Sequence, residues 1–231
     1  MLFGEYANQR LLLRLPHRQI VFTFPKILRH FFPHEHSLLS EVGRLVYRLM
    51  QDADRAAAGK PVQGAAVIVY ASAGDFVRWN PHLHAIFLEG GFDRQGRFVH
   101  LPSLDLPRLA QLFRVSMLAF FLQRSLINER LARSMLGWTH SGFSLDMSAK
   151  IPAASSRARE ALAQYIAPPP ISLAKMLVQE HHSSLLYRSE YNPYFKTNAR
   201  LFPALEFLVH LLQHLIKTGL APPSLEAATP S

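Results

Sequence analysis

Short runs of β-branched and aromatic residues mark the expected strands of this chain. Residues 19–24 (QIVFTF) stop at a proline, and residues 65–70 (AAVIVY) form a second apolar run. Runs of this length and composition are typical of buried β-strands. Residues 143–147 alternate between apolar and polar positions, and 184–188 has a similar character, so we expect strands there as well.

Leucine, valine and alanine recur at three- and four-residue spacing between these runs. Over 37–60 this spacing predicts an amphipathic helix that ends at a Gly-Lys-Pro sequence. The same spacing predicts a long helix over 106–136 and a last helix over 201–217. The chain therefore alternates between strand-like and helix-like segments.

One hairpin is expected in the middle of the chain. Residues 72–80 predict a loop that leads into an apolar strand ending at Gly90 and Gly91. Gly-Gly between two strand-like runs indicates a turn, so we expect the chain to return antiparallel through 97–100. Strands interleaved with helices, some joined by a tight hairpin, predict an α+β fold with helices packed on a mainly antiparallel central sheet.

The length of 231 residues fits one large domain, which we place at 1–217. The last segment, 218–231, has three prolines and no periodicity, so we predict a disordered tail. The most apolar late stretch, 201–216, contains four polar or charged residues and is shorter than the ~20 residues that a membrane span needs. We therefore expect no membrane partner and a cytoplasmic location.

The charge balance adds a partner class. Lys and Arg number 25 against 16 Asp and Glu, which gives a formal net charge of +9. A basic balance of this size favours a polyanionic partner, because neutralising phosphates releases counterions. The chain has no cysteine, which excludes disulfides, cysteine-ligated zinc and thiol chemistry.

A histidine pair supplies the first candidate chemistry. His82 and His84 flank one leucine at the front of the expected apolar strand. Residues i and i+2 of a strand point to the same face, roughly 6.5 Å apart along the chain, so both imidazoles can bind one cation. Two imidazoles rarely complete a site, and the spacing leaves three further ligands open: Asn80, Gln164 and Glu89. The pairs His34/His36 and His181/His182 show that such spacing also arises by chance in a chain with 12 histidines.

Tyr165 supplies the second candidate chemistry. It lies in an expected helix over 157–167, which Ser155 and Ser156 can cap and three prolines end. One interpretation makes it a half-buried core aromatic. A nucleophilic role needs help, because ionising a phenol of pKa near 10 at pH 7 costs about 4 kcal/mol. A divalent cation on the histidine pair would supply that help by polarising a phosphodiester.

Five ordered segments resemble one known family. They are PHRQIVFTFPK at 16–26, NPHLHAIFLEGGF at 80–92, HSGFSLDMSAKIP at 140–152, the tyrosine helix followed by PPIS, and YNPYFK at 191–196. Together they resemble the IS91-type transposases of the His-hydrophobe-His superfamily of rolling-circle nucleases. The resemblance spans roughly 16–217, which is most of the chain.

The resemblance implies an activity and its residues. It implies a DNA transposase that nicks and joins single-stranded DNA at transposon ends, through a 5′-phosphotyrosine intermediate and a free 3′-hydroxyl. It also implies Mg²⁺ or Mn²⁺ on His82 and His84, Tyr165 as the catalytic nucleophile, and a bacterial, nucleoid-associated location. Imidazole ligands suit manganese better than magnesium, and both ions stay open.

Several departures from the family pattern leave alternatives. We expect a form of the family without the cysteine-rich, zinc-binding region that many relatives carry upstream of the first strand, and with a shortened C-terminal ending. Two-tyrosine members carry a second tyrosine where this chain has Ala161, so single-tyrosine chemistry is expected. Gln164 and Pro168 stand where arginine is common, which should weaken phosphate positioning. The alternatives are a catalytically inactive DNA-binding remnant and a related replication initiator or relaxase.

Overall fold

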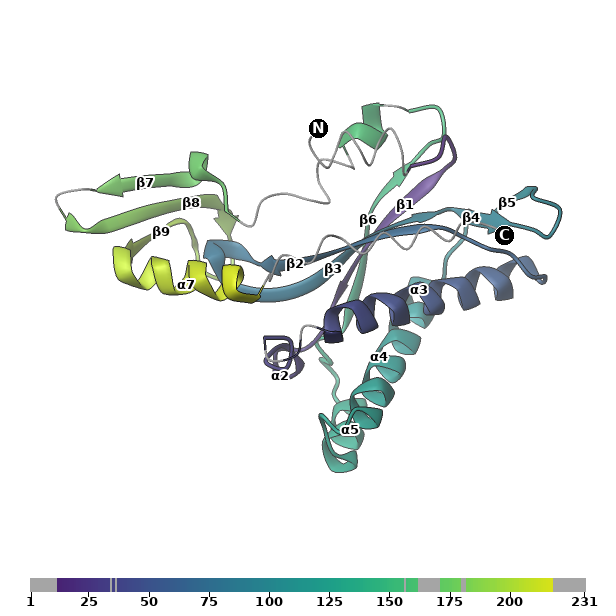
Figure 1. The fold of residues 1–231 in the computed structure, drawn as a ribbon, viewed down its shortest axis with the longest axis horizontal. Helices are drawn as coiled ribbons and strands as arrows, with labels where there is room; N and C mark the ends of the chain where they lie inside the picture. Colours follow the sequence, from purple (N-terminus) through teal and green to yellow (C-terminus); the bar gives the residue numbers. More distant parts are fainter. Residues whose placement is uncertain are drawn as a thin grey trace. The chain divides into compact units, whose positions relative to one another are not determined.

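A sheet with the strand order β2-β3-β1-β6 organises the first part of the computed structural model (Figure 1). Its strands are β1 (His17–Thr23), β2 (Ala66–Ala73), β3 (Trp79–Leu88) and β6 (Ser144–Ile151). Strand β1 runs antiparallel to both β3 and β6. This confirms the expected strands near 19–24, 65–70 and 143–147.

The structure describes residues 12–33, 35, 37–155, 157–161, 171–179 and 182–217. They form two compact units, one with the described residues up to 70 and from 82 to 161, the other with 71–81 and 171–217. A single catalytic domain over 1–217 stays a prediction, and the expected tail at 218–231 lies outside the described residues. No helix of the described part is long and apolar enough to cross a membrane.

Helices cover one face of the four-stranded sheet (Figure 1). The main ones are α3 (Ser37–Ala58) and α4 (Leu106–Gln123), and short α2 (Lys26–Arg29) follows β1. Phe22 of β1 lies at the centre of this face, with its ring 5.2 Å from Phe113 of α4 and 6.3 Å from Phe87 of β3. This is the main hydrophobic core, and it confirms both the helix expected over 37–60 and the α+β architecture.

The long helix expected over 106–136 is wrong, because the chain forms α4 and then a separate helix, α5 (Glu129–Leu136). Ser125 adopts a positive φ of 54°, and Asn128 caps α5 by accepting a hydrogen bond from the Leu131 amide. Buried Arg114 of α4 donates to the backbone carbonyls of Met135 and Trp138 and so fastens α5. The apolar spacing continues through the break, which is why periodicity alone did not reveal it.

Among the described residues, one end of the opposite face of the sheet carries a small apolar cluster. There Leu12, Ile86 and Ile151 form a small buried cluster. Val67 and Val69 of β2 and Ala158, at the start of the next helical segment, pack against it. This face also carries His82 and His84, since alternate residues of β3 share a face.

The hairpin expected around Gly90 and Gly91 exists, but its turn lies elsewhere. Both glycines belong to β4 (Gly90–Phe92), which pairs with β5 (Phe98–His100). A Cβ atom on Gly90 would lie 2.0 Å from the Val99 carbonyl oxygen, so the glycine is required by a close backbone approach and by its φ of 135°.

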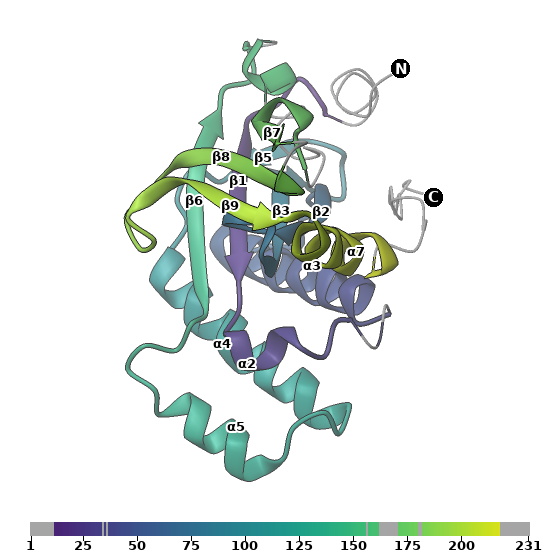
Figure 2. The same cartoon turned by 90° about the vertical axis from the view of Figure 1, so that its left-hand side faces the viewer.

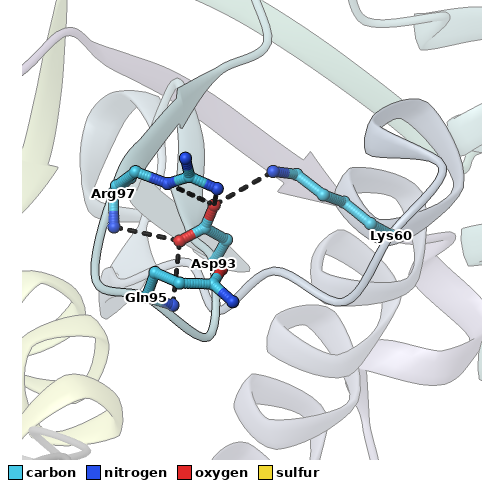
Figure 3. A network of polar contacts seen from close by, with 4 residues as sticks. All are labelled: Lys60, Asp93, Gln95 and Arg97. Atoms are coloured by element: carbon cyan, nitrogen blue, oxygen red, sulfur yellow. Dashed lines mark hydrogen bonds and ion pairs between the residues drawn. The ribbon is translucent and has the colours of Figure 1, made fainter.

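The turn of this hairpin is organised by Asp93 (Figure 3). Its carboxylate accepts hydrogen bonds from the backbone amides of Gln95 and Arg97, and from the side chains of Lys60 and Arg97. Hydrogen bonds from Lys60 and from Arg97 hold the pKa of this carboxyl well below its usual range. A buried carboxylate with this many donors stabilises a turn of five residues, 93–97, where the Gly-Gly sequence predicted a two-residue turn.

The second unit is built on a three-stranded antiparallel sheet in the order β7-β8-β9 (Figure 2). The strands are β7 (Met176–Gln179), β8 (Ser184–Asn192) and β9 (Thr197–Pro203), and α7 (Ala204–Lys217) packs on β8 and β9. Two short 3₁₀ turns, η2 (Asp75–Val77) and η3 (Leu173–Lys175), complete the unit. The strand expected at 184–188 is confirmed, while the last helix begins at 204 because residues 201–203 complete β9.

The second unit has a hydrophobic core of its own. It consists of aromatic and aliphatic side chains from η2, β8, β9 and α7: Phe76, Val77, Leu185, Tyr187, Phe202 and Phe207. Buried His214 of α7 hydrogen-bonds to the Ser72 hydroxyl and the Val77 carbonyl oxygen. Residues 72–80, expected as a loop, therefore include the end of β2, η2 and the start of β3, and they contribute to this core.

Candidate functional site

The histidine pair lies on β3 beside the end of β1. The antiparallel register places His82 opposite Thr23 and His84 opposite Val21. Leu83 points to the other face, where it is buried with the core. The strand therefore separates the two imidazoles from the core side chain between them, as the sequence predicted.

The two rings lie close together in an edge-on arrangement. Their Nε2 atoms are 2.9 Å apart and their ring centroids 4.7 Å apart. Burial, and then the neighbouring His82, lower the pKa of His84 to about 4. His84 is therefore neutral at pH 7, and the neutral imidazole is the form that binds metal ions.

This geometry fits a divalent cation. Two ligands in adjacent positions of an octahedral ion lie about 3.0 Å apart when each is about 2.1 Å from the ion. The 2.9 Å between the two Nε2 atoms matches that separation. Within the described part of the chain, however, no group of three His, Asp or Glu residues is close enough to hold a metal.

Glu89, one of the candidates for a third ligand, is engaged elsewhere. Its carboxylate lies 2.9 Å from His100, 3.4 Å from Lys150 and 3.9 Å from buried Arg18. Burial opposes ionisation of Glu89, but the hydrogen bond with His100 and the charges of Arg18 and Lys150 together lower its pKa. Asn80 lies on β3 two residues before His82, and Gln164 lies outside the described residues.

The register reveals polar neighbours that the sequence did not single out. Across β1, Ser144 of β6 continues the row of His82 and Thr23, and Asp146 continues the row of His84 and Val21. Thr23 and Ser144 share a hydrogen bond of 2.5 Å between their hydroxyl oxygens. Cross-strand partners point to the same face, so the exposed Asp146 carboxylate lies on the histidine side of the sheet. Its alternation within 143–147 was visible in the sequence, but its partner strand was not.

Tyr165 lies outside the described residues, and only the start of its segment is described. Residues 157–161 are helical, and the Ser155 hydroxyl accepts a hydrogen bond from the Ala158 amide, which confirms Ser155 as a cap. Ala158 packs against the cluster that contains Ile86. Arg159 interacts electrostatically with His17, whose pKa is lowered mainly by burial and also by this charge. The segment therefore starts on the same sheet face as the histidine pair.

A comparison with protein families identifies the chain. Residues 66–222, more than half of its length, match the family model described as "Putative transposase". The chain belongs to this transposase family. Curated proteins and solved structures were compared as well, and neither gave a match. The matched range contains His82, His84 and Tyr165, so all three candidate site residues fall within the transposase domain.

Membership of a transposase family implies DNA as the partner. The β4–β5 hairpin and the adjacent end of α3 carry charges that suit such a partner. Arg55 and Arg94 line a depression with Val62, Gln63 and Phe92. The Asp93 carboxylate of the same hairpin is already bonded to Lys60 and Arg97 (Figure 3). Cations outnumber anions here, which suits contact with a phosphate backbone.

Proposed function

We propose that this transposase is a single-tyrosine nicking enzyme of the IS91 type. It cuts and joins single-stranded DNA at the ends of its element, with Mg²⁺ or Mn²⁺ on His82 and His84 and with Tyr165 as nucleophile. The observation that carries the proposal is the 2.9 Å separation of the two Nε2 atoms on one sheet face. The two nitrogens lie at hydrogen-bond distance, and a divalent cation that replaced this hydrogen bond would have them in adjacent coordination positions.

The placement of residues 157–161 supports Tyr165 as the nucleophile. Ala158 packs against the cluster of Leu12, Ile86 and Ile151, and Ile86 follows His84 on the same face of β3. His84 and His82 lie roughly 6.5 and 13 Å from Ile86 along the strand. The described start of the segment that carries Tyr165 therefore lies on the sheet face of the histidine pair.

The proposed step transfers a phosphoryl group between two oxygens. The Tyr165 hydroxyl oxygen attacks the phosphorus, and the bond from phosphorus to the 3′-oxygen breaks. The product is a 5′-phosphotyrosine, the tyrosine proton passes to solvent, and the 3′-oxygen leaves and is protonated as a free hydroxyl. A bound cation would supply Lewis-acid polarisation of the phosphodiester. The protein's own contribution is to hold that cation with His82 and His84 and to orient the phenol.

Paired substitutions test the proposal. His82→Ala/His84→Ala should reduce Mn²⁺-dependent nicking of a single-stranded oligonucleotide by at least ~100-fold, with an unchanged circular dichroism spectrum. Tyr165→Phe should give no covalent protein–DNA adduct on a denaturing gel. His182→Ala, which removes an exposed histidine of the second unit, is the matched control and should cleave normally.

Two results would contradict the proposal. Undiminished cleavage by the double histidine variant would remove the metal assignment. An adduct that persists in Tyr165→Phe and disappears with Tyr187, Tyr191 or Tyr194 would move the nucleophile to another tyrosine.

A second candidate function is a DNA-binding remnant without cleavage. One observation favours it, namely that no third His, Asp or Glu side chain joins the histidine pair within the described residues. Such a protein would bind DNA with an affinity that falls steeply with salt. It would form no adduct under any metal condition, and the histidine variants would bind DNA as the unaltered protein does.

A further inference from the structure

Two tyrosines are presented to solvent at the tip of the β8–β9 hairpin. The side chains of Tyr191 and Tyr194 are 65% and 77% exposed. An aromatic ring loses about 1.5–3 kcal/mol of burial energy when it stays in water. Neither ring is used by the core of the second unit, where Tyr187 of the same strand is buried.

The tip that carries these rings is held firmly. The Asn192 side-chain oxygen Oδ1 accepts hydrogen bonds of 2.8 and 3.1 Å from the backbone amides of Tyr194 and Phe195. Its side-chain nitrogen donates to the Asp75 carboxylate at 2.6 Å. The exposure of the two tyrosines is therefore built into the turn.

Phe195 anchors the same turn to the body of the unit. Its ring lies 5.5 Å from the ring of Phe76, which is buried, and the Arg78 guanidinium lies 5.0 Å from its centroid. The Tyr194 ring meets Phe195 edge to face at 4.9 Å. A ligand that contacts the tyrosines meets a preorganised surface, which lowers the entropy lost on binding.

The charges around the tip select the kind of ligand. Arg188 and Lys196 are exposed on this hairpin, and Arg78 lies beside Phe195. The exposed carboxylates are Glu190 on the hairpin and Asp75, which bonds to Asn192, so cations outnumber carboxylates. Exposed aromatic rings among cations are the combination that binds single strands, because bases stack on the rings while the cations contact the backbone. A duplex does not offer its base faces to such rings, since they are already stacked on each other.

We infer that Tyr191 and Tyr194 form a base-stacking site for single-stranded DNA on the β8–β9 hairpin. This inference rests on the proposed function, which supplies single-stranded DNA as the partner. It does not depend on the histidine pair or on Tyr165. It assigns the YNPYFK segment a role in holding the strand. Cleavage chemistry stays with the first unit.

Binding of labelled oligonucleotides tests this site. The probes are a fluorescein-labelled single strand of about 20 nucleotides and the duplex of the same sequence, measured by anisotropy at one salt concentration. Stacking contributes about 1–3 kcal/mol per base, so Tyr191→Ala/Tyr194→Ala should raise the Kd for the single strand at least about 10-fold. The Kd for the duplex should change less than about 3-fold.

Two controls isolate the rings. Tyr191→Phe/Tyr194→Phe keeps both rings and should bind the single strand nearly as the unaltered protein does. Leu205→Ala removes an exposed apolar side chain of α7 in the same unit, 74% exposed, and should have no effect. The steepness of the salt dependence should be the same in all variants, because the cations are retained.

Three outcomes would overturn the site: unchanged single-strand affinity in the alanine variant, an equal loss for the duplex, or an equal loss in the phenylalanine variant. Sedimentation of the alanine variant provides a further test. A change in its sedimentation without a change in its affinity for the single strand would indicate a protein partner and would also overturn the site. Failure of the proposed function would give a different result. His82→Ala/His84→Ala would then cleave normally, while Tyr191→Ala/Tyr194→Ala would still lose affinity for the single strand.

Discussion

The two faces of the β2-β3-β1-β6 sheet differ in how deeply their side chains are buried. Under the helices, Ile20 and Phe22 of β1 are fully buried. On the other face, Val21 and Thr23 of the same strand are partly exposed beside the histidine pair. Stability therefore depends mainly on the helix-covered face, and the open face can carry polar chemistry at little cost to folding.

The open face is itself divided along the strands. Leu12, Ile86 and Ile151 bury one end, whereas His82, Thr23 and Ser144 make the other end polar. A site at the polar end rests on a rigid strand and still meets solvent. That combination is suited to a functional group whose position must be fixed.

Truncation of the central aromatic should give the largest effect on folding. Phe22→Ala removes a fully buried ring that contacts Phe87 and Phe113, and we expect a loss of about 3–5 kcal/mol in the free energy of unfolding. Urea unfolding followed by circular dichroism measures it. His82→Ala, on the open face of the same sheet, should cost less than about 1 kcal/mol. Similar losses for both variants would remove the distinction between the faces.

A buried carboxylate on the covered face should make stability depend on pH. Burial raises the pKa of Asp54 in α3 to about 6, although the nearby Arg18 lowers it in part. The protonated form is favoured in the folded state, so its stabilisation is complete below the ordinary pKa of 3.8 and is lost as the pH rises through 6.

Asp54→Asn should remove that dependence. The variant should match the unaltered protein near pH 4 and exceed its stability by about 1–2 kcal/mol at pH 7, after allowance for solvent screening. Thermal unfolding at several pH values measures the difference, with the exposed Asp52→Asn as the matched control. A variant less stable than the parent at pH 7 would show that the Arg18 attraction outweighs burial.

The smallest effect is expected at the polar end of the open face. Thr23→Ala removes the hydroxyl pair with Ser144 from a partly exposed position, and we expect a loss of about 0.5–1 kcal/mol. Ser144→Ala and the double variant complete a cycle whose coupling energy isolates the pair. A loss as large as that of Phe22→Ala would show that this end also holds the fold together.

The strands and the histidine pair could be predicted from sequence because both are local patterns. The strand over 19–24 and the alternation around His82 and His84 depend only on neighbouring residues. The break between α4 and α5 could not be predicted, because it depends on a positive φ at Ser125 inside a continuous apolar pattern. The sequence predicts a turn at the glycines of β4, because no local pattern shows that the backbone they must accommodate lies on another strand.

The candidate site also has a part that could be predicted from local sequence and a part that could not. The spacing of His82 and His84 predicted their shared face, and the structure gave the 2.9 Å between their nitrogens. Asp146 entered only through the register of β6 with β1, which no local pattern encodes. The roles of Tyr165 and of the cation remain predictions.

The attachment of α5 has a consequence for which of its positions tolerate mutation. Arg114 holds α5 through the carbonyl oxygens of Met135 and Trp138, which every amino acid provides. Exposed positions of α5 can therefore change without loss of these acceptors. Changes at Arg114, or at the buried Ala132 and Met135, would disturb how the helix is held.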